Sequence, residues 1–398
     1  MTNQKAPSAL KLGIDVLCEQ HIADLKTQRV ALLSHAAAVN AQRESTLRVL
    51  WQHPLVNLVK LFAPEHGFYG TAQDMEGVRN ENDPSTGLPI ISLYGNSLET
   101  LSPKEKDLAD IDVLVCDLQD IGSRYYTFIY SIALCLTVCA KLKKQIVVLD
   151  RPNPLNGVAI EGNILDPAFS SFVGLYPLPV RHGMTVGEMT NYVNKTQGID
   201  CDLTVIPMQG WERILYWDET GLDFIPPSPN MPTLGTALVY PGMCLIESTH
   251  VSEGRGTTKP FEWIGAPYMH AQRLADELTE QQLPGVFFRP IHFTPCFQKW
   301  AREECHGVQI HVTDRHTFKS YLTGLTVLAT IIKKYPFNFA WREKPYEFVT
   351  DRPAIDLLTG GCDFRELVTN KKPTGGFLQT FEADEKKFAK LRQEYLLY

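Results

Sequence analysis

About the first 240 residues alternate short apolar runs with stretches of helical periodicity, and this alternation limits the possible folds more than any other feature of the chain. Apolar runs of strand length occupy residues 29–34, 58–63, 90–94, 111–117, 145–150 and 203–207. The helical stretches between them include residues 42–52, 125–142 and 185–196. Strands and helices in alternation are typical of parallel βαβ units, with helices on both faces of one sheet. We therefore predict an α/β fold built on a Rossmann-like, doubly wound parallel sheet.

The chain changes character after a proline-dense segment at residues 225–232, which we interpret as the joint between two domains. Residues 240–265 are rich in Gly, Ser, Thr and Glu and suggest an ordered functional loop. Helices are predicted at 271–280, 318–335 and 382–396, and strands at 286–293 and 307–312. We therefore predict a Rossmann-like catalytic domain over residues 11–235 and a smaller α+β auxiliary domain over residues 236–398 that closes the cleft.

Composition and charge exclude several classes of protein. The chain has 398 residues, of which 44% are hydrophobic, and this length allows two domains with sizeable cores. Its net charge of −7, without a stripe of Lys and Arg, argues against a nucleic-acid partner. No apolar run approaches the length that spans a bilayer, so we expect no membrane association.

Motifs for cofactors and metals are missing from the positions where they would be expected. The turn after the first predicted strand reads Ser34-His-Ala-Ala-Ala-Val39 where a dinucleotide fold would have GxGxxG, and no Walker sequence occurs. The nine cysteines form neither a CxxC nor a Cys/His zinc spacing, and the histidines are dispersed without an HExxH pair. The sequence therefore predicts neither a cofactor nor a metal site.

Cysteine usage and the N-terminal residues bear on the compartment. An odd number of cysteines, several of them in apolar surroundings, favours a reducing environment. Residues 1–8 have no apolar segment typical of a signal peptide. We therefore expect a cytoplasmic location, or an exported protein (periplasmic or secreted) if a signal peptide has been removed.

Polar residues follow several predicted strands. Ser34 ends the first strand, Glu65 and His66 follow the second after Pro64, and Asp120 comes shortly after the strand at 111–117. Ligands in open α/β sheets bind outside the carboxyl ends of such strands, so these residues are candidates for a site. In the alternative interpretation Glu65 caps a turn, His66 is an ordinary loop histidine, and Asp120 caps the helix that follows.

Two arginine-containing segments are further candidates. Glu253 and Arg255 lie among glycines in the segment 247–258, where backbone amides can approach a ligand and a planar guanidinium can grip a carboxylate. The alternative is a surface loop with an internal ion pair. Arg181 and His182 precede a predicted helix and could place a cation and an imidazole at its positive end. His182 is equally well explained as a structural hydrogen-bonding residue.

Several motifs, in one order along the chain, resemble the NamZ-type exo-β-N-acetylmuramidases, a bacterial glycoside hydrolase family. The resemblance runs from about residue 12 to the C-terminus. The motifs are Ala-Pro-Glu-His-Gly-Phe at 63–68, Thr-Gly-Leu-Pro at 86–89, Ser-Leu-Tyr-Gly at 92–95, the segment 117–127, Asp-Arg-Pro-Asn-Pro at 150–154, the segment 181–188, Pro-Asn-Met-Pro at 229–232, and Ser-Glu-Gly-Arg-Gly-Thr-Thr at 252–258. The chain departs from the family at Ser34-His35, where members tend to have Thr-Asn, and in lacking an export signal.

The resemblance implies a Rossmann-like domain, a smaller auxiliary domain and a site between them. It also implies release of terminal β-linked N-acetylmuramic acid from the non-reducing end of peptidoglycan fragments. Glycoside cleavage usually uses two carboxyl groups. We assign Glu65 as the general acid, with His66 orienting it, and leave Asp120 and Glu253 as competitors for the second role. A mechanism assisted by the substrate's acetamido group would need no protein nucleophile.

The expected substrate is a small saccharide, and its lactyl carboxylate would bind a cation. The candidate substrate-binding residues are Arg255, Arg124, Arg181, His182, Ser34 and Tyr125. A cell-wall amidase or esterase using Ser34 and His35 is one alternative, although adjacent residues of a strand point to opposite faces. A non-catalytic muropeptide-binding or sensing protein is another. The oligomeric state is left open.

Overall fold

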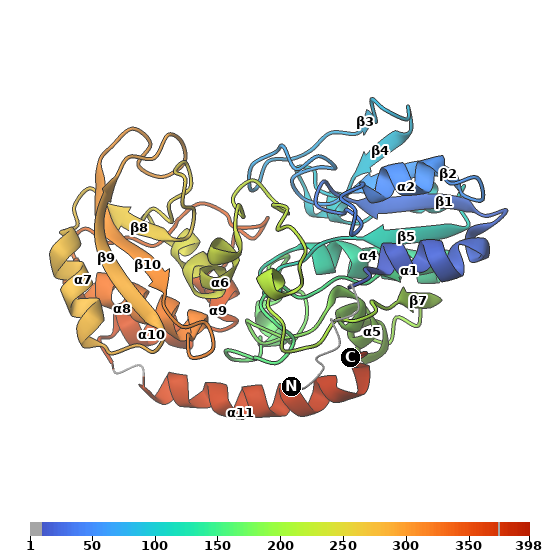
Figure 1. The fold of residues 1–398 in the computed structure, drawn as a ribbon. Coiled ribbons are helices and arrows are strands. Elements are labelled where there is room, and N and C mark those ends of the chain that lie inside the picture. Colours follow the sequence, from blue (N-terminus) through green and yellow to red (C-terminus); the bar gives the residue numbers. More distant parts are fainter. Residues whose placement is uncertain (1–9, 373–374) are drawn as a thin grey trace, which may run out of the picture.

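The computed structural model describes residues 10–372 and 375–398, and its main element is a seven-stranded sheet (Figure 1). The strand order is β3-β4-β2-β1-β5-β6-β7, in which β3 alone pairs antiparallel with its neighbour. The strands are β1 Arg29–Ser34, β2 Asn57–Ala63, β3 Glu81–Asn82, β4 Pro89–Ser92, β5 Val113–Asp117, β6 Gln145–Leu149 and β7 Leu203–Ile206. The predicted Rossmann-like α/β fold is confirmed.

Alternate residues of the central strands enter two separate cores, which explains why these strands read as continuous apolar runs. Ala31 and Leu33 of β1 belong to one hydrophobic cluster, whereas Val30 and Leu32 belong to another. Because β1 pairs in parallel with both β2 and β5, the winding of the chain reverses at β1. The carboxyl ends of β2, β1 and β5 therefore meet at one edge, where the predicted site residues begin.

Helices of the first part are shorter than the sequence predicts at their N-terminal ends. Helix α4 spans Phe128–Leu142 and begins three residues after the predicted start, because Tyr125 and Tyr126 belong to the turn before it. Helix α2, Thr46–Gln52, starts where Ser45 caps the backbone N–H of Arg48. Helix α5, Val186–Thr196, has the capping box that its sequence predicts. The other short helices here are α1 Gly13–Val16 and α3 Glu105–Leu108.

The second part of the chain contains a three-stranded antiparallel sheet of order β8-β10-β9, with helices α7 and α8 beside it (Figure 1). Its elements are α6 Leu234–Met243, β8 Trp263–Ala266, α7 Ala271–Glu280, β9 Val286–Phe293, β10 Cys305–Val312, α8 Ser320–Lys334, α9 Ala354–Thr359 and α10 Asp363–Thr369. This sheet and its helices confirm the predicted smaller α+β unit. The exact division at residue 235 stays a prediction.

The expectation of a loop over residues 240–265 is wrong at its two ends, where α6 reaches Met243 and β8 begins at Trp263, while residues 249–262 form neither a helix nor a strand. Pro241 and Gly242 argue against a helix in the sequence, yet both lie inside α6 or its last turn. Gly242 is required by packing, because a Cβ atom there would lie 1.9 Å from the Ser320 carbonyl oxygen of α8. The two helices cross so closely that glycine at 242 and at 324 is the residue that fits.

Helix α11, Gly375–Leu391, runs along both parts of the molecule (Figure 1). Near its start Phe381 packs against Tyr321 of α8, and near its end Phe388 packs against Tyr192 of α5. The 3₁₀ turn that follows continues along α5, and Tyr398 contacts Trp211. The predicted helix at 382–396 therefore starts earlier and connects the two parts. Among the described residues no helix combines the length and apolar character needed to cross a membrane.

Candidate active site

A narrow cavity lies between the two parts of the molecule, and polar and aromatic side chains make up most of its lining. The lining residues are Glu65, His66, Asp74, Met75, Tyr125, Tyr126, Thr127, Phe128, Val173, Ser228, Asn230, Met231, Tyr240, Glu247, Arg255, Phe261, Tyr346 and Glu347. The cavity is thus built by the turn after β2, the start of α4, the proline-dense joint, α6 and the glycine-rich segment.

Glu65 is held at the cavity by the turn that follows β2. Its side chain is buried, and its Oε2 accepts a 2.7 Å hydrogen bond from the Thr127 hydroxyl at the N-terminus of α4. His66 has a φ of 70°, an uncommon value for a residue with a side chain, and its Nδ1 lies 3.0 Å from the Ala72 carbonyl oxygen. The turn therefore places Glu65 and His66 together in the wall of the cavity, as the sequence suggested.

Glu347 is a second buried carboxyl group at the cavity, and sequence reasoning missed it. Its Oε2 accepts a 2.9 Å hydrogen bond from the Tyr94 hydroxyl. Burial raises the pKa of Glu347 well above its ordinary value, and the negative charge of Glu65 raises it further. Burial and then the charges of Glu65 and Glu347 also raise the Tyr94 pKa, so the phenol stays protonated between two carboxyl groups.

Glu347 carried one weak sequence signal, which was the surrounding Lys344-Pro-Tyr-Glu-Phe-Val349 stretch without helical or strand periodicity. In the structure Glu347 and Phe348 both have positive φ, at 44° and 66°. Non-glycine residues in this conformation are uncommon and concentrate at functional sites. The strained turn aims the Glu347 carboxyl into the cavity, and this conformation is not visible in the residue letters.

Arg255 lies in the cavity wall among three carboxylates. Its Nη1 donates a 2.6 Å hydrogen bond to Glu247 and lies 3.5 Å from Glu253, while its Nε lies 3.3 Å from Asp74. The guanidinium also stacks over the Phe261 ring, at 4.9 Å from the centroid. The predicted contact between Glu253 and Arg255 is present, but it lies inside a larger buried network.

Glu253 and Asp120, the two competitors for the second catalytic carboxyl, are both absent from the lining of the cavity. Burial raises the pKa of Glu253, but the charges of Lys299 and Arg255 outweigh this effect and hold the pKa below its ordinary value. Lys299 Nζ lies 2.8 Å from Glu253 Oε2. Burial raises the pKa of Asp120 to about 7, against the lowering effect of the Gly122 N–H bond. Glu253 is therefore an ion-paired anion and Asp120 a buried acid with a raised pKa.

Of the six predicted substrate-binding residues, Arg255 and Tyr125 line the cavity and four do not. Arg124 is fully buried and donates hydrogen bonds to the carbonyl oxygens of Asn163, Leu178 and Leu358. Arg181 pairs with Glu161 at 2.9 Å. His182 accepts a 3.2 Å bond from the Met184 N–H, and burial lowers its pKa to about 3. These three side chains hold the scaffold, and Ser34 is buried at the end of β1.

The proposed serine–histidine pair has no catalytic geometry. Both nitrogens of His35 are engaged elsewhere, because Nε2 accepts a 2.8 Å hydrogen bond from the Gln119 N–H and Nδ1 lies 3.3 Å from the Pro227 carbonyl oxygen. Burial lowers the pKa of His35 to about 3. A general base must reach the proton of its nucleophile, and His35 is directed away from that task. The site is instead a cavity of carboxyl groups.

Comparisons with known proteins agree with this arrangement. The family model for the N-terminal part of the exo-β-N-acetylmuramidase NamZ matches residues 30–235, and the model for its C-terminal part matches residues 238–398. The chain is 43% identical over 389 residues to the peptidoglycan β-N-acetylmuramidase NamZ of Bacillus subtilis strain 168, covering 98% of this chain and 91% of the relative.

Two crystal structures of DUF1343 family proteins from Bacteroides fragilis share the fold. One is 35% identical with a TM-score of 0.89, and the other is 30% identical with a TM-score of 0.77. Each comparison covers 98% of this chain and 99% of the other chain. Because the family models and a 43% identical relative together span nearly its whole length, the chain belongs to the exo-β-N-acetylmuramidase NamZ family.

Proposed function

We propose that this protein is an exo-acting glycoside hydrolase that releases terminal β-linked N-acetylmuramic acid from the non-reducing end of peptidoglycan fragments. The observation that carries the proposal is the pair of buried carboxyl groups, Glu65 and Glu347, at one cavity with the Tyr94 hydroxyl between their charges. Two carboxyl groups of different protonation are what glycosidic bond cleavage requires.

The two carboxyl groups have different environments, and this difference supports different roles. Glu347 holds a proton because burial and the charge of Glu65 raise its pKa, so Glu347 is suited to protonate the leaving oxygen. Glu65 accepts hydrogen bonds from the Thr127 hydroxyl and, at 3.5 Å, from the Met75 N–H, so both of its oxygens act as acceptors. We therefore revise our first assignment and give the general-acid role to Glu347.

Glu65, as the anion, would stabilise the positive charge that develops on the sugar. It would do so by activating water, by attacking the anomeric carbon, or by orienting the substrate's own acetamido group. His66 lies beside it in the cavity wall and stays a positioning residue in this proposal. Each of these routes needs one protonated carboxyl group, here Glu347, and one carboxylate, here Glu65.

Arg255 and Tyr125 are the proposed recognition groups. The contacts of Arg255 with the surrounding acids involve Nη1 and Nε, so Nη2 is the atom we assign to the lactyl carboxylate. The Tyr125 hydroxyl is buried at the cavity and finds no hydrogen-bond partner within the residues that the structure describes. A buried, unpaired hydroxyl is costly, and a sugar hydroxyl would satisfy it.

Turnover of a chromogenic β-N-acetylmuramide, measured beside the matching β-N-acetylglucosaminide, tests the proposal. We expect release from the muramide alone, and loss of that release in Glu347→Gln with the folded state retained. Equal release from both sugars would overturn the role of Arg255. Release from neither, with tight binding of the free sugar, would favour the sensing protein.

We also propose that the protein works in a reducing compartment. All nine cysteines are free, and Cys116, Cys135 and Cys139 are buried in the apolar core. Buried cysteines that act as small apolar side chains need no oxidising environment. Fractionation of the producing cells, followed by detection of the protein, checks this placement. Recovery outside the cytoplasm would contradict it.

A further inference from the structure

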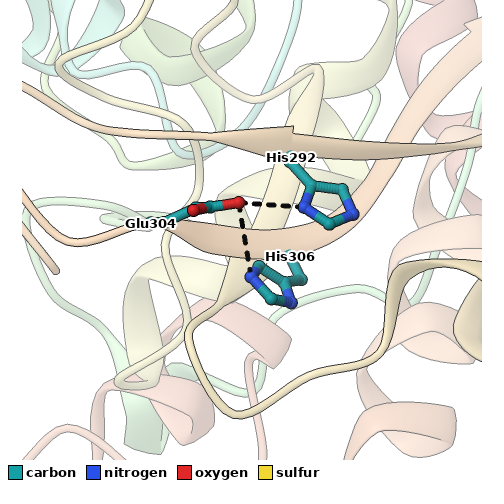
Figure 2. A group of neighbouring side chains, drawn as sticks. All are labelled: His292, Glu304 and His306. Carbon is teal, nitrogen blue, oxygen red and sulfur yellow. Dashed lines mark hydrogen bonds and ion pairs between the residues drawn. The ribbon is translucent and has the colours of Figure 1, made fainter.

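His292, Glu304 and His306 form a cluster on the second sheet, away from the residues that line the cavity (Figure 2). His292 of β9 and His306 of β10 lie directly opposite each other in the antiparallel ladder. Such a pair has its Cβ atoms about 4.5–5.5 Å apart, so the backbone itself brings the two imidazoles together. Glu304 precedes His306 by two residues and therefore points to the same side.

The donor atoms of the cluster converge. Glu304 Oε1 lies 3.0 Å from His292 Nδ1 and 3.6 Å from His306 Nε2 (Figure 2). The two rings are stacked with their centroids 4.4 Å apart, and the three donor atoms all lie within 4.8 Å of one another. Donors around one tetrahedral zinc ion are about 3.3 Å apart, given Zn–N and Zn–O distances of about 2.0–2.2 Å. Small side-chain rotations would close that difference.

The chemistry of the cluster fits a borderline divalent cation. Two imidazole nitrogens and one carboxylate oxygen are ligands that Zn²⁺ prefers, and they suit Ca²⁺ or Mg²⁺ poorly. His292 and Glu304 are exposed and His306 is partly exposed, which leaves room for water in a fourth position.

The position of the cluster connects it to the cavity. The segment 294–303, which joins β9 to β10, starts just after His292 and ends just before Glu304. Within it Gln298 Nε2 donates a 3.1 Å hydrogen bond to Asp74, and Lys299 Nζ lies 2.8 Å from Glu253. Asp74 and Glu253 are the carboxylates around Arg255. This segment is therefore the structure that fixes one side of the cavity wall.

The segment is also conformationally strained. Gln298, Trp300 and Arg302 have positive φ values of 66°, 58° and 67°, which non-glycine residues rarely adopt. Strained backbone persists when its surroundings hold it in place. A cross-link between the ends of a loop removes conformational freedom from it, so a cation at its base would hold the strained segment.

We propose that His292, Glu304 and His306 bind one divalent transition-metal ion, with Zn²⁺ as the preferred ion, and that this ion staples the two ends of segment 294–303. The site lies outside the proposed catalytic cavity, and the proposal does not depend on the activity of the protein. The ion would keep Gln298 and Lys299 in contact with Asp74 and Glu253.

Calorimetric titration of the whole protein with zinc chloride tests the site. We expect one zinc ion per chain, with at least tenfold weaker binding in His292→Ala and in His306→Ala. Two variants serve as controls: His21→Ala removes an exposed histidine that also lies near a carboxylate, and Cys296→Ser removes the exposed thiol in the segment. Unchanged binding in both controls supports the proposal. Binding that survives in His292→Ala and His306→Ala, or disappears in Cys296→Ser, would overturn it.

Hydrogen exchange tests the staple itself. Zinc should slow amide exchange across residues 294–303 in the wild-type protein and leave exchange unchanged in His292→Ala. This measurement has a readout that does not need turnover or a sugar substrate. Binding of zinc without slower exchange in the segment would overturn the stapling role.

Discussion

Arg124 and Arg255 are both buried arginines that the sequence nominated for substrate binding, and the structure gives them opposite surroundings. Arg124 donates to three backbone carbonyl oxygens, with distances of 3.0, 2.7 and 2.7 Å. Arg255 faces the carboxylates of Asp74, Glu247 and Glu253. One arginine meets neutral acceptors that are already part of the backbone, whereas the other meets charged side chains that can rearrange around a ligand.

This difference separates scaffold from site more clearly than burial or charge does. The last acceptor of Arg124 belongs to Leu358 of α9, so this guanidinium ties the entrance of α4 to the second part of the molecule. Around Arg255, the cavity wall carries the carboxyl groups of Glu65, Asp74, Glu247 and Glu347 against one guanidinium. An excess of negative charge in a closed space favours the protonated form of one of the acids. The raised pKa of Glu347 indicates that this acid is Glu347.

The largest effect should come from removing either carboxyl group of the cavity. Glu65→Gln and Glu347→Gln should each lower kcat by about 10²–10⁴-fold, the usual contribution of a positioned acid or base. The Tm of both variants should stay close to that of the wild type, because glutamine has nearly the size of glutamate and keeps one acceptor oxygen. Turnover of a chromogenic muramide and thermal unfolding measure the two quantities.

Glu343→Gln is the matched control for this pair, because Glu343 is exposed and lies in the same segment as Glu347. It should retain full turnover. If Glu347→Gln also retained turnover, the carboxyl groups around Arg255 would not contribute to catalysis. The difference between Arg124 and Arg255 would then be structural only.

Removing Arg124 tests the scaffold half of the comparison. Arg124→Met leaves three buried carbonyl oxygens without their donor, which should reduce the free energy of unfolding by about 3 kcal/mol or more. Denaturant unfolding followed by circular dichroism gives this value. Arg43→Met, which removes an exposed arginine paired with Asp223, should leave the free energy of unfolding nearly unchanged. If the Arg124→Met protein were as stable as the wild type but had a raised KM, Arg124 would be a substrate-binding residue.

Replacing Arg255 by lysine keeps the charge and removes the planar donors. We expect KM for the muramide to rise by about 10–100-fold, because hydrogen bonds to charged groups are worth about 1.5–3 kcal/mol, with a smaller change in kcat. Michaelis–Menten kinetics on the muramide separate the two constants. A fall in kcat with KM unchanged would mean that Arg255 acts on the carboxyl pair and does not bind substrate.

The smallest effect concerns Asp120, a raised-pKa acid outside the cavity. Its folded-state pKa of about 7 lies above its usual value, so between about pH 4 and pH 7 the unfolded state ionises while the folded state stays protonated. Stability from this group is therefore complete at low pH and is lost as pH rises through that window. Asp120→Asn should be more stable than the wild type at pH 8 and equal to it near pH 4.

Thermal unfolding of Asp120→Asn at both pH values checks this prediction, and its turnover should match that of the wild type. A loss of turnover comparable to that of Glu65→Gln would restore Asp120 as the second catalytic carboxyl. A variant that is less stable than the wild type at pH 8 would mean that the surroundings of Asp120 stabilise its ionised form, which contradicts the raised pKa.

Most strands of the large sheet could be predicted, because apolar runs between turn residues are local signals. The position of Glu65 followed from the same logic, since the turn after β2 opens on the edge of the sheet where ligands bind in open α/β folds. Helix α6 could not be predicted, because Pro241 and Gly242 contradict helix propensity and are explained by close contact with α8. That contact joins segments far apart in the chain.

The candidate site was predicted only in part for a related reason. Which arginine meets carbonyl oxygens and which meets carboxylates depends on tertiary neighbours, as Arg124 and Arg255 demonstrate. Glu347 was missed because a positive φ at a non-glycine residue leaves no mark on the sequence. The pairing of His292 with His306 likewise became visible only through the register of β9 and β10.

Helix α11 has a consequence for the order in which the protein is made. Phe388 and Tyr398 pack against α5 and Trp211, which the ribosome delivers long before it delivers α11. Domains generally begin to fold during synthesis, from the N-terminus onward. The apolar faces of Tyr192 and Trp211 therefore stay without these partners in the nascent chain until the C-terminal segment has been synthesised.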